Sequence, residues 1–179
     1  MTEAQAPIRV VLLPGQGFQD EEYVYPYYRC LEAGWATEVA TKDGQNVTGK
    51  FGVPARATMA TTALDADRFD AVIIPGGFEG PDRVRLLPEV LEFIREMDRK
   101  GKLIAAICHG PWVLISAGVT RGRKMTAFWS IEADLRNSGA DYQHKVPVVV
   151  DGHFITSPHY NNNGDFMKAV VDYLRPARG

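Results

Sequence analysis

Short apolar runs alternate along the chain with segments of helical periodicity, and this alternation limits the possible folds more than any other feature. The runs at residues 8–13, 69–74 and 103–107 have the length of buried strands, and residues 37–41 predict a fourth strand. Helical patterns occupy residues 21–33, 86–100, 110–117, 130–137 and 165–174. Strands and helices in this order form a mainly parallel sheet with helices on both faces. We therefore expect an α/β fold built as a three-layer sandwich.

The C-terminal part of the chain predicts one departure from the parallel arrangement. Residues 146–150 and 153–156 are strand-like and flank the dipeptide Asp151-Gly152. Because Asp-Gly between two such runs is typical of a two-residue turn, we expect a β-hairpin there. Residues 124–128 predict a further short strand, whereas residues 43–63 favour no particular element.

Length and composition indicate an ordinary globular protein. The 179 residues suit a single domain, and we expect its core to lie at about residues 8–175. The net charge of −2 gives no reason to expect a nucleic-acid or membrane partner. No stretch approaches the ~18 apolar residues of a membrane span, and residues 1–7 lack the pattern of a signal peptide. We therefore expect a cytoplasmic protein.

Cysteine and histidine usage predicts neither a disulfide framework nor a metal site. The chain has two cysteines, Cys30 and Cys108, which are too few for such a framework. Its four histidines do not stand at ligand spacing from cysteines or carboxylates. The segment Gly15-Gln16-Gly17 is too short for a dinucleotide-binding fingerprint. We therefore expect no metal and no other cofactor.

The segment around Cys108 is the strongest candidate for chemistry. Ligands of parallel α/β sheets bind beyond the carboxyl ends of the strands, where residues 15–22, 75–82 and 108–111 would meet. Cys108 stands where an apolar run stops and a predicted helix begins, a place that resembles a nucleophile elbow. Helix N–H groups there would lower the pKa of the thiol, and the adjacent His109 could act as a base. The alternative is a buried, inert cysteine, the interpretation that we give to Cys30.

Three segments together resemble the ThiJ/PfpI superfamily, and most closely its PfpI-type intracellular cysteine peptidases. They are residues 18–22 (FQDEE) with 25–27 (YPY), residues 75–77 (PGG) with 81–85 (PDRVR), and residues 107–111 (ICHGP) with 114–118 (LISAG) and 121–124 (RGRK). Each piece alone is weakly specific, but the three occur in order and at spacings that fill a domain. The resemblance extends from about residue 9 to residue 174.

The resemblance implies a flavodoxin-like sandwich related to the class I glutamine amidotransferases. It makes Cys108 the nucleophile and His109 the neighbouring base. It matches Glu22 to the acidic residue that contacts the thiol. It matches Asp82 to an acidic residue that orients the histidine from an adjacent subunit. The backbone around Gly77 and His109 would form the oxyanion hole, and the protein would be a homo-oligomer, either a dimer or a hexamer built from dimers.

Each of these assignments has a structural alternative. Glu22 could stabilise its own helix, because a negative charge near the N-terminus interacts favourably with the helix dipole. Asp82 could cap the helix that begins near it. Gly76 and Gly77 could form a tight turn without a binding role. His159 follows a predicted strand end, so it could reach the pocket as an alternative base, or it could be an ordinary loop histidine. The segment at residues 157–165 departs from the family pattern, as does Trp112.

We expect a cysteine-dependent hydrolase or lyase that acts on small carbonyl or amide substrates, similar to a glyoxalase or deglycase. Thiolate attack on an electrophilic carbon followed by proton transfer is common to these reactions. An intracellular cysteine peptidase is the alternative enzyme. A redox or stress-response protein that senses oxidant at Cys108, and a catalytically silent chaperone-like oligomer, are the alternatives without turnover.

Overall fold

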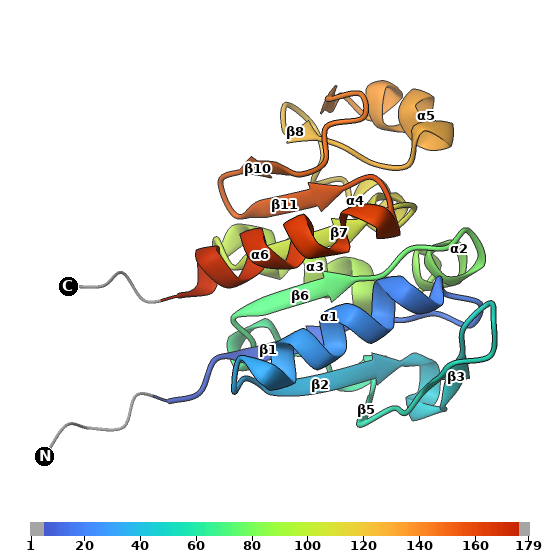
Figure 1. The fold of residues 1–179 in the computed structure, drawn as a ribbon, viewed down its shortest axis with the longest axis vertical. Coiled ribbons are helices and arrows are strands. Elements are labelled where there is room, and N and C mark those ends of the chain that lie inside the picture. Colours follow the sequence, from blue (N-terminus) through green and yellow to red (C-terminus); the bar gives the residue numbers. More distant parts are fainter. Residues whose placement is uncertain (1–5, 176–179) are drawn as a thin grey trace, which may run out of the picture.

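A seven-stranded sheet forms the centre of the computed structural model, which describes residues 6–175. Its strands are β1 (Arg9–Leu12), β2 (Ala36–Thr41), β5 (Met59–Ala60), β6 (Ala71–Ile74), β7 (Leu103–Ile107), β10 (Val149–Asp151) and β11 (Phe154–Ser157). The strand order is β10-β11-β7-β6-β1-β2-β5, and every neighbouring pair is parallel except the β10–β11 hairpin. The predicted α/β fold with a C-terminal hairpin is therefore confirmed (Figure 1).

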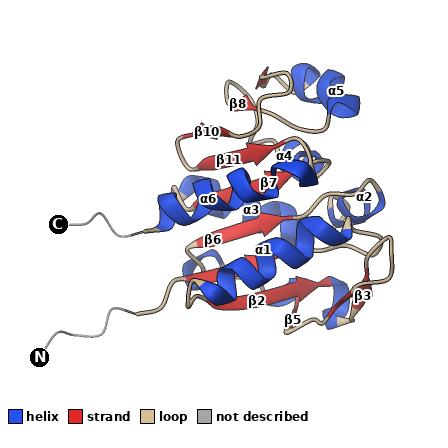
Figure 2. Ribbon diagram, viewed as in Figure 1, coloured by secondary structure: helices blue, strands red, loops and turns tan. Residues whose placement is uncertain are grey.

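Helices cover both faces of this sheet. The helices α1 (Asp20–Glu32) and α6 (Asn163–Leu174) pack side by side on one face (Figure 2). The helices α3 (Pro88–Arg99) and α4 (Pro111–Ala117) cover the other, and α2 (Glu79–Val84) lies beside α4. Within residues 6–175 each helix is too short or too polar to cross a bilayer.

The central strands are apolar on both sides, because each side meets a helical layer. Along β6, Val72 and Ile74 point into the cluster formed with α3 and α4, whereas Ala71 and Ile73 point towards α1 and α6. This alternation follows from the two-residue period of a strand. It explains why β6 and β7 read as continuous apolar runs in the sequence, as is typical of buried parallel strands.

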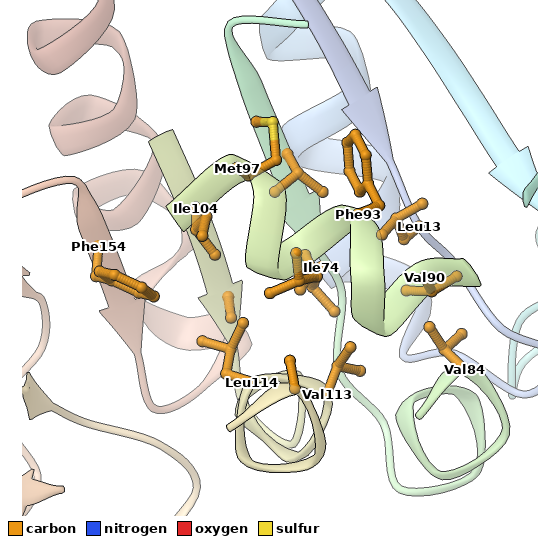
Figure 3. Close-up of a cluster of buried hydrophobic side chains, with 14 of the residues drawn as sticks. Leu13, Ile74, Val84, Val90, Phe93, Met97, Ile104, Val113, Leu114 and Phe154 are labelled. Atoms are coloured by element: carbon orange, nitrogen blue, oxygen red, sulfur yellow. The ribbon is translucent and has the colours of Figure 1, made fainter. Parts of the chain in front are cut away.

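The larger cluster of buried side chains lies on the side of α3 and α4 (Figure 3). Met97 and Phe93 of α3 pack over the sheet there, and Leu114 of α4 packs near Ile74 and Ile104. All five are at most 4% exposed. This core holds the ends of β6 and β7, and therefore the loops that follow them, in a fixed arrangement.

The structure differs from the sequence-based elements between residues 79 and 100. The expected helix at residues 86–100 begins only at Pro88, whose ring lacks an N–H and suits a first helical turn. The preceding helix α2 begins at Glu79, ahead of the helix start near Asp82 that a capping role for Asp82 would need. Pro81 lies in the first turn of α2, where a missing N–H costs no helical hydrogen bond.

Smaller elements complete the chain. The expected strand at residues 124–128 is limited to β8 (Lys124–Met125), because the N–H of Phe128 turns away and donates to the carbonyl of Cys108 at 3.0 Å. The remaining elements are β3 (Val47–Thr48), β4 (Pro54–Ala55), α5 (Glu132–Asn137), β9 (Asp141–Tyr142) and five short 3-10 turns among the described residues. The unassigned residues 43–63 thus hold β3, β4 and the edge strand β5.

Truncation of Ile104 tests the importance of this core. Ile104 is fully buried at the centre of β7, so Ile104→Ala is expected to lower the free energy of unfolding by about 2–5 kcal/mol. Leu86→Ala is the control, because Leu86 is 74% exposed. Urea unfolding of both variants measures the difference. Equal losses in the two variants would contradict this description of the core.

Candidate active site

Cys108 occupies a strained turn between β7 and α4. Its φ is +61°, in the left-handed region that side chains other than glycine rarely adopt. Such a conformation costs about 1–3 kcal/mol and persists only where surrounding contacts hold it. Here the Cys108 N–H donates to the Ser157 carbonyl at 2.9 Å, and the Cys108 carbonyl accepts from Phe128 at 3.0 Å. The turn is therefore a built elbow that fixes where the thiol lies.

Gly76 and Gly77 follow β6 and lie directly against this elbow. A Cβ on Gly76 would come within 2.5 Å of the Cys108 Cβ and 2.7 Å of the Ile107 carbonyl oxygen. Gly77 has a φ of +78°, and its N–H bonds to the Cys108 sulfur. The glycines therefore form a tight turn and also bring backbone to the thiol, so the two interpretations of the sequence are compatible.

Glu22 lies in the first turn of α1, yet its carboxyl is turned inwards and fully buried. Oε2 accepts from the Gly76 N–H at 2.9 Å, and the carboxyl also hydrogen-bonds with the Cys108 thiol. Oε1 is buried and has no hydrogen-bond partner among the described residues. Burial raises the Glu22 pKa to about 8, against the opposing effect of these hydrogen bonds. The carboxyl is therefore largely protonated at neutral pH.

The pKa of the Cys108 thiol is raised, and the sequence-based expectation of a lowered pKa is wrong. Burial is the main cause, and the charge of an ionised Glu22 adds to it. The N–H groups of Gly77 and His109 oppose the shift by donating to the sulfur. Cys30 is buried in α1 without such donors, and burial raises its pKa to about 12.

The helix N-terminus contributes less to the thiol than the sequence suggests. α4 begins at Pro111, which has no N–H to offer. The neighbouring amides are used locally: Gly110 donates to Ile107 at 2.8 Å, and Trp112 donates to His109 at 3.0 Å. The donors that reach the sulfur come from the turn itself and from the Gly77 loop.

His109 lies beside the thiol with its two ring nitrogens in different surroundings. Nδ1 is 3.2 Å from the Cys108 Sγ, and Nε2 is 3.1 Å from the Ser130 Oγ. The ring stacks on Phe128 and meets Trp112 edge-on, both at 5.0 Å between centroids. Burial lowers the His109 pKa to about 4, so the imidazole is neutral at pH 7 and can accept a proton.

Asp82 lies apart from this group within the single chain. It is exposed on α2, and among the described residues its carboxylate makes no hydrogen bond to His109. It does not cap α2 either, because the capping position belongs to Phe78 and shows no side-chain bond.

His159 follows β11 and lies among the aromatic side chains around the elbow. Its ring is 3.9 Å from that of Tyr160 and 5.9 Å from those of Phe128 and Trp129. Its Nδ1 accepts from the Asn161 N–H at 3.2 Å. His159 therefore belongs to a group of packed aromatic rings, and its role as an alternative base stays a prediction. Ser130 and Phe128, which touch His109, were not identified from the sequence.

Other histidines of the described part pair with carboxylates. His144 bonds to Glu132 and His153 bonds to Asp98, each at 2.8 Å. In residues 6–175 no three His, Cys, Asp or Glu side chains gather closely enough to hold a metal ion.

Comparison with known proteins gives consistent matches over almost the whole chain. The model of the DJ-1/PfpI family matches residues 8–173. The "Deglycase PfpI" of Pyrococcus furiosus is 37% identical over 168 residues, 94% of this chain and 100% of the relative. The "Putative cysteine protease YraA" of Bacillus subtilis is also 37% identical, over 93% of this chain and 98% of the relative. The crystal structure of Drosophila melanogaster DJ-1beta superposes with a TM-score of 0.88 at 27% identity, covering 94% of this chain and 90% of that one.

The buried carboxyl of Glu22 predicts a pH-dependent stability. Folding raises the pKa of Glu22 from 4.5 to about 8. As the pH rises, the carboxyl therefore loses its proton in the unfolded chain before it does so in the folded chain. The stability that the Glu22 carboxyl contributes is therefore fully present below about pH 4.5 and is lost as the pH rises towards 8. The free energy of unfolding falls by up to ~1.4 kcal/mol per pH unit from this cause. Glu22→Gln is expected to remove this slope, as measured by urea unfolding between pH 6.5 and 8, where His109 is mostly neutral in both the folded and the unfolded chain. Glu21→Gln, which alters the exposed neighbour, should retain it, and equal slopes in wild type and Glu22→Gln would rule this out.

Proposed function

This chain belongs to the DJ-1/PfpI family and is an enzyme of the PfpI type, and on that premise we propose that it is a cysteine-dependent deglycase. Its substrates would be amines or thiols that carry an adduct of a small carbonyl compound. The full-length match to a relative named as a deglycase supports this choice. We therefore propose deglycation as the reaction, with peptide hydrolysis as the alternative.

The observation that carries the proposal is the surroundings of the Cys108 sulfur. The sulfur is hydrogen-bonded to a buried carboxyl of raised pKa and to two backbone N–H groups, and a neutral imidazole lies 3.2 Å away. Attack needs a group that takes the thiol proton, donors for the oxygen that becomes negative, and a proton for the leaving group. We assign the first to His109, the second to the N–H groups of Gly77 and His109, and the third to Glu22 or His109.

The proposed reaction balances without an added oxidant or reductant. For a 2-oxoaldehyde adduct, a hydrogen shift between the two neighbouring carbons first gives the isomeric 2-hydroxyacyl form. The Cys108 thiolate then forms a C–S bond at the acyl carbon, and the bond to the amine or thiol breaks as that group takes a proton. Water hydrolyses the resulting thioester, which releases a 2-hydroxy acid and restores the thiol.

Replacement of each cysteine in turn tests this assignment. Cys108→Ala is expected to lower release of free N-acetylarginine from its methylglyoxal adduct by at least about a thousand-fold, because no covalent route remains. Cys30→Ala should keep turnover close to wild type, because Cys30 is buried in α1. Chromatography of the released amino acid measures both.

A panel of substrates separates the other functions. Cleavage of a peptide in the absence of adduct turnover would indicate a peptidase instead. Stoichiometric oxidation of Cys108 without turnover would indicate a sensor. Either result, or full turnover in Cys108→Ala, would contradict the deglycase proposal.

We also propose that the protein assembles and that Asp82 acts on His109 of a second copy. The carboxylate is exposed on α2, where it is free to meet another chain. The apolar Phe78, 55% exposed, lies at the start of the same helix and would be covered by that contact. A carboxylate brought near His109 would stabilise the imidazolium that forms when the ring takes a proton.

Mixing of inactive variants tests this contribution. Cys108→Ala and Asp82→Ala are each expected to lose most turnover. After subunit exchange at equal amounts, half of randomly formed dimers would be mixed, each with one intact site, so about a quarter of wild-type turnover should return. Light scattering and native mass spectrometry measure assembly and exchange. A fully active monomer, or proven exchange without recovery, would overturn the proposal.

A further inference from the structure

The far nitrogen of His109 is held by a residue of the same chain. Ser130 Oγ lies 3.1 Å from Nε2, while Nδ1 faces the Cys108 Sγ at 3.2 Å. We propose that Ser130 is a positioning residue that keeps the proton of His109 on Nε2 and so leaves the Nδ1 lone pair facing the Cys108 thiol. This inference rests on the proposed role of Cys108 as nucleophile.

The ring is held in one orientation by its neighbours. Phe128 stacks on one side at an interplanar angle of 26°, and Trp112 lies against the ring at 62°. Trp112 is itself fixed, because its indole Nε1 donates to Asp134 at 2.8 Å. This packing fixes the plane of the His109 ring, and the contacts of Nδ1 with Cys108 and of Nε2 with Ser130 fix which ring atoms face each side.

The chemistry of the two neighbours selects the tautomer. A neutral imidazole has one nitrogen that donates and one that accepts. The proposed role of His109 as the base for the Cys108 thiol requires an unprotonated Nδ1, the ring atom that lies 3.2 Å from Sγ. Nε2 must then carry the hydrogen and needs an acceptor of its own. The hydroxyl oxygen of Ser130 supplies it.

The position of Ser130 is tied to the elbow by backbone contacts. The residue lies in a short turn at Trp129–Ile131, before α5. The N–H of Phe128 donates to the Cys108 carbonyl at 3.0 Å, and the N–H of Ile131 donates to the Phe128 carbonyl at 3.0 Å. The hydroxyl is therefore held relative to the turn that carries the thiol, although Ser130 itself is exposed.

Charged groups lie near His109 on several of the elements around it. Asp134 of α5 raises the His109 pKa against the larger effect of burial, and Glu22 of α1 lies beyond the thiol. Arg85, which follows α2, lies over the Trp112 ring at 5.4 Å. Removal of the uncharged Ser130 hydroxyl leaves all these charges in place. Its effect is therefore separable from that of Asp82, which would act through its charge.

Alkylation of Cys108 by iodoacetamide across a pH series tests the proposal without an assay of turnover. The full-length protein carries Cys30→Ala, so that the label reports one thiol. Ser130→Ala is expected to slow alkylation at neutral pH by about five-fold, the effect of losing one neutral hydrogen bond. Ser130→Thr should restore the rate, because it returns a hydroxyl. NMR shifts of the imidazole nitrogens should show Nε2 protonated in wild type and a mixture of tautomers in Ser130→Ala.

Ser138→Ala is the matched control, because its hydroxyl bonds to Thr120 and Leu135 instead. It should leave the alkylation profile and the tautomer unchanged. Unchanged rates and shifts in Ser130→Ala, or equal losses in Ser130→Ala and Ser130→Thr, would overturn the role of Ser130. If the Ser130 effects appear but no deglycase turnover is found, the proposed function fails while this inference stands.

Discussion

The close approach of the loops after β6 and β7 is the constraint on which the site depends. Gly76 lies so near the elbow that any side chain would meet the Cys108 Cβ and the Ile107 carbonyl. The reverse contact is as close, since a Cβ on Gly110 would come within 2.6 Å of the Ile74 carbonyl oxygen. Two glycines on facing loops thus let backbone N–H groups reach the buried Cys108 sulfur.

A buried site with two acidic groups distributes protons in a particular way. Burial disfavours charge on both Glu22 and Cys108, and a charge on either one disfavours the other. Both groups are therefore largely neutral at pH 7, and a negative charge that forms when one proton leaves can be shared between them, with the Gly76 and Gly77 amides as donors. With Cys108 as the proposed nucleophile, its reactivity would depend on where this charge lies and on a neutral His109, rather than on a thiolate formed by a helix dipole.

The sequence predicts the elements that bury their side chains on a regular period and misses those fixed by single tertiary contacts. β6 and β7 were recognisable as continuous apolar runs, and Cys108 as the residue that follows one of them. The end of β8 depends instead on one hydrogen bond from Phe128 to the elbow, which no local pattern reveals. The position of Ser130 depends on the same hydrogen bond, because the turn that holds Ser130 directly follows Phe128. The raised pKa of Cys108 was missed because it depends on how deeply the folded chain buries the thiol, which the sequence alone does not show.

The residues of the candidate site fall into two groups. Most of them lie in contact within one copy of the chain, whereas Asp82 makes no hydrogen bond to His109 of the same copy. Segments far apart in the sequence bring Glu22, Gly77, Cys108, His109 and Ser130 into contact within a single copy. Packing and backbone bonds fix their geometry, so assembly is not needed to align the thiol with the imidazole. A second copy could still add charge, because a neutral His109 that takes a proton in a buried site would be stabilised by a nearby carboxylate. In this arrangement orientation is a property of one copy, and under the proposed assembly Asp82 of a second copy would add electrostatic support for the charged intermediate.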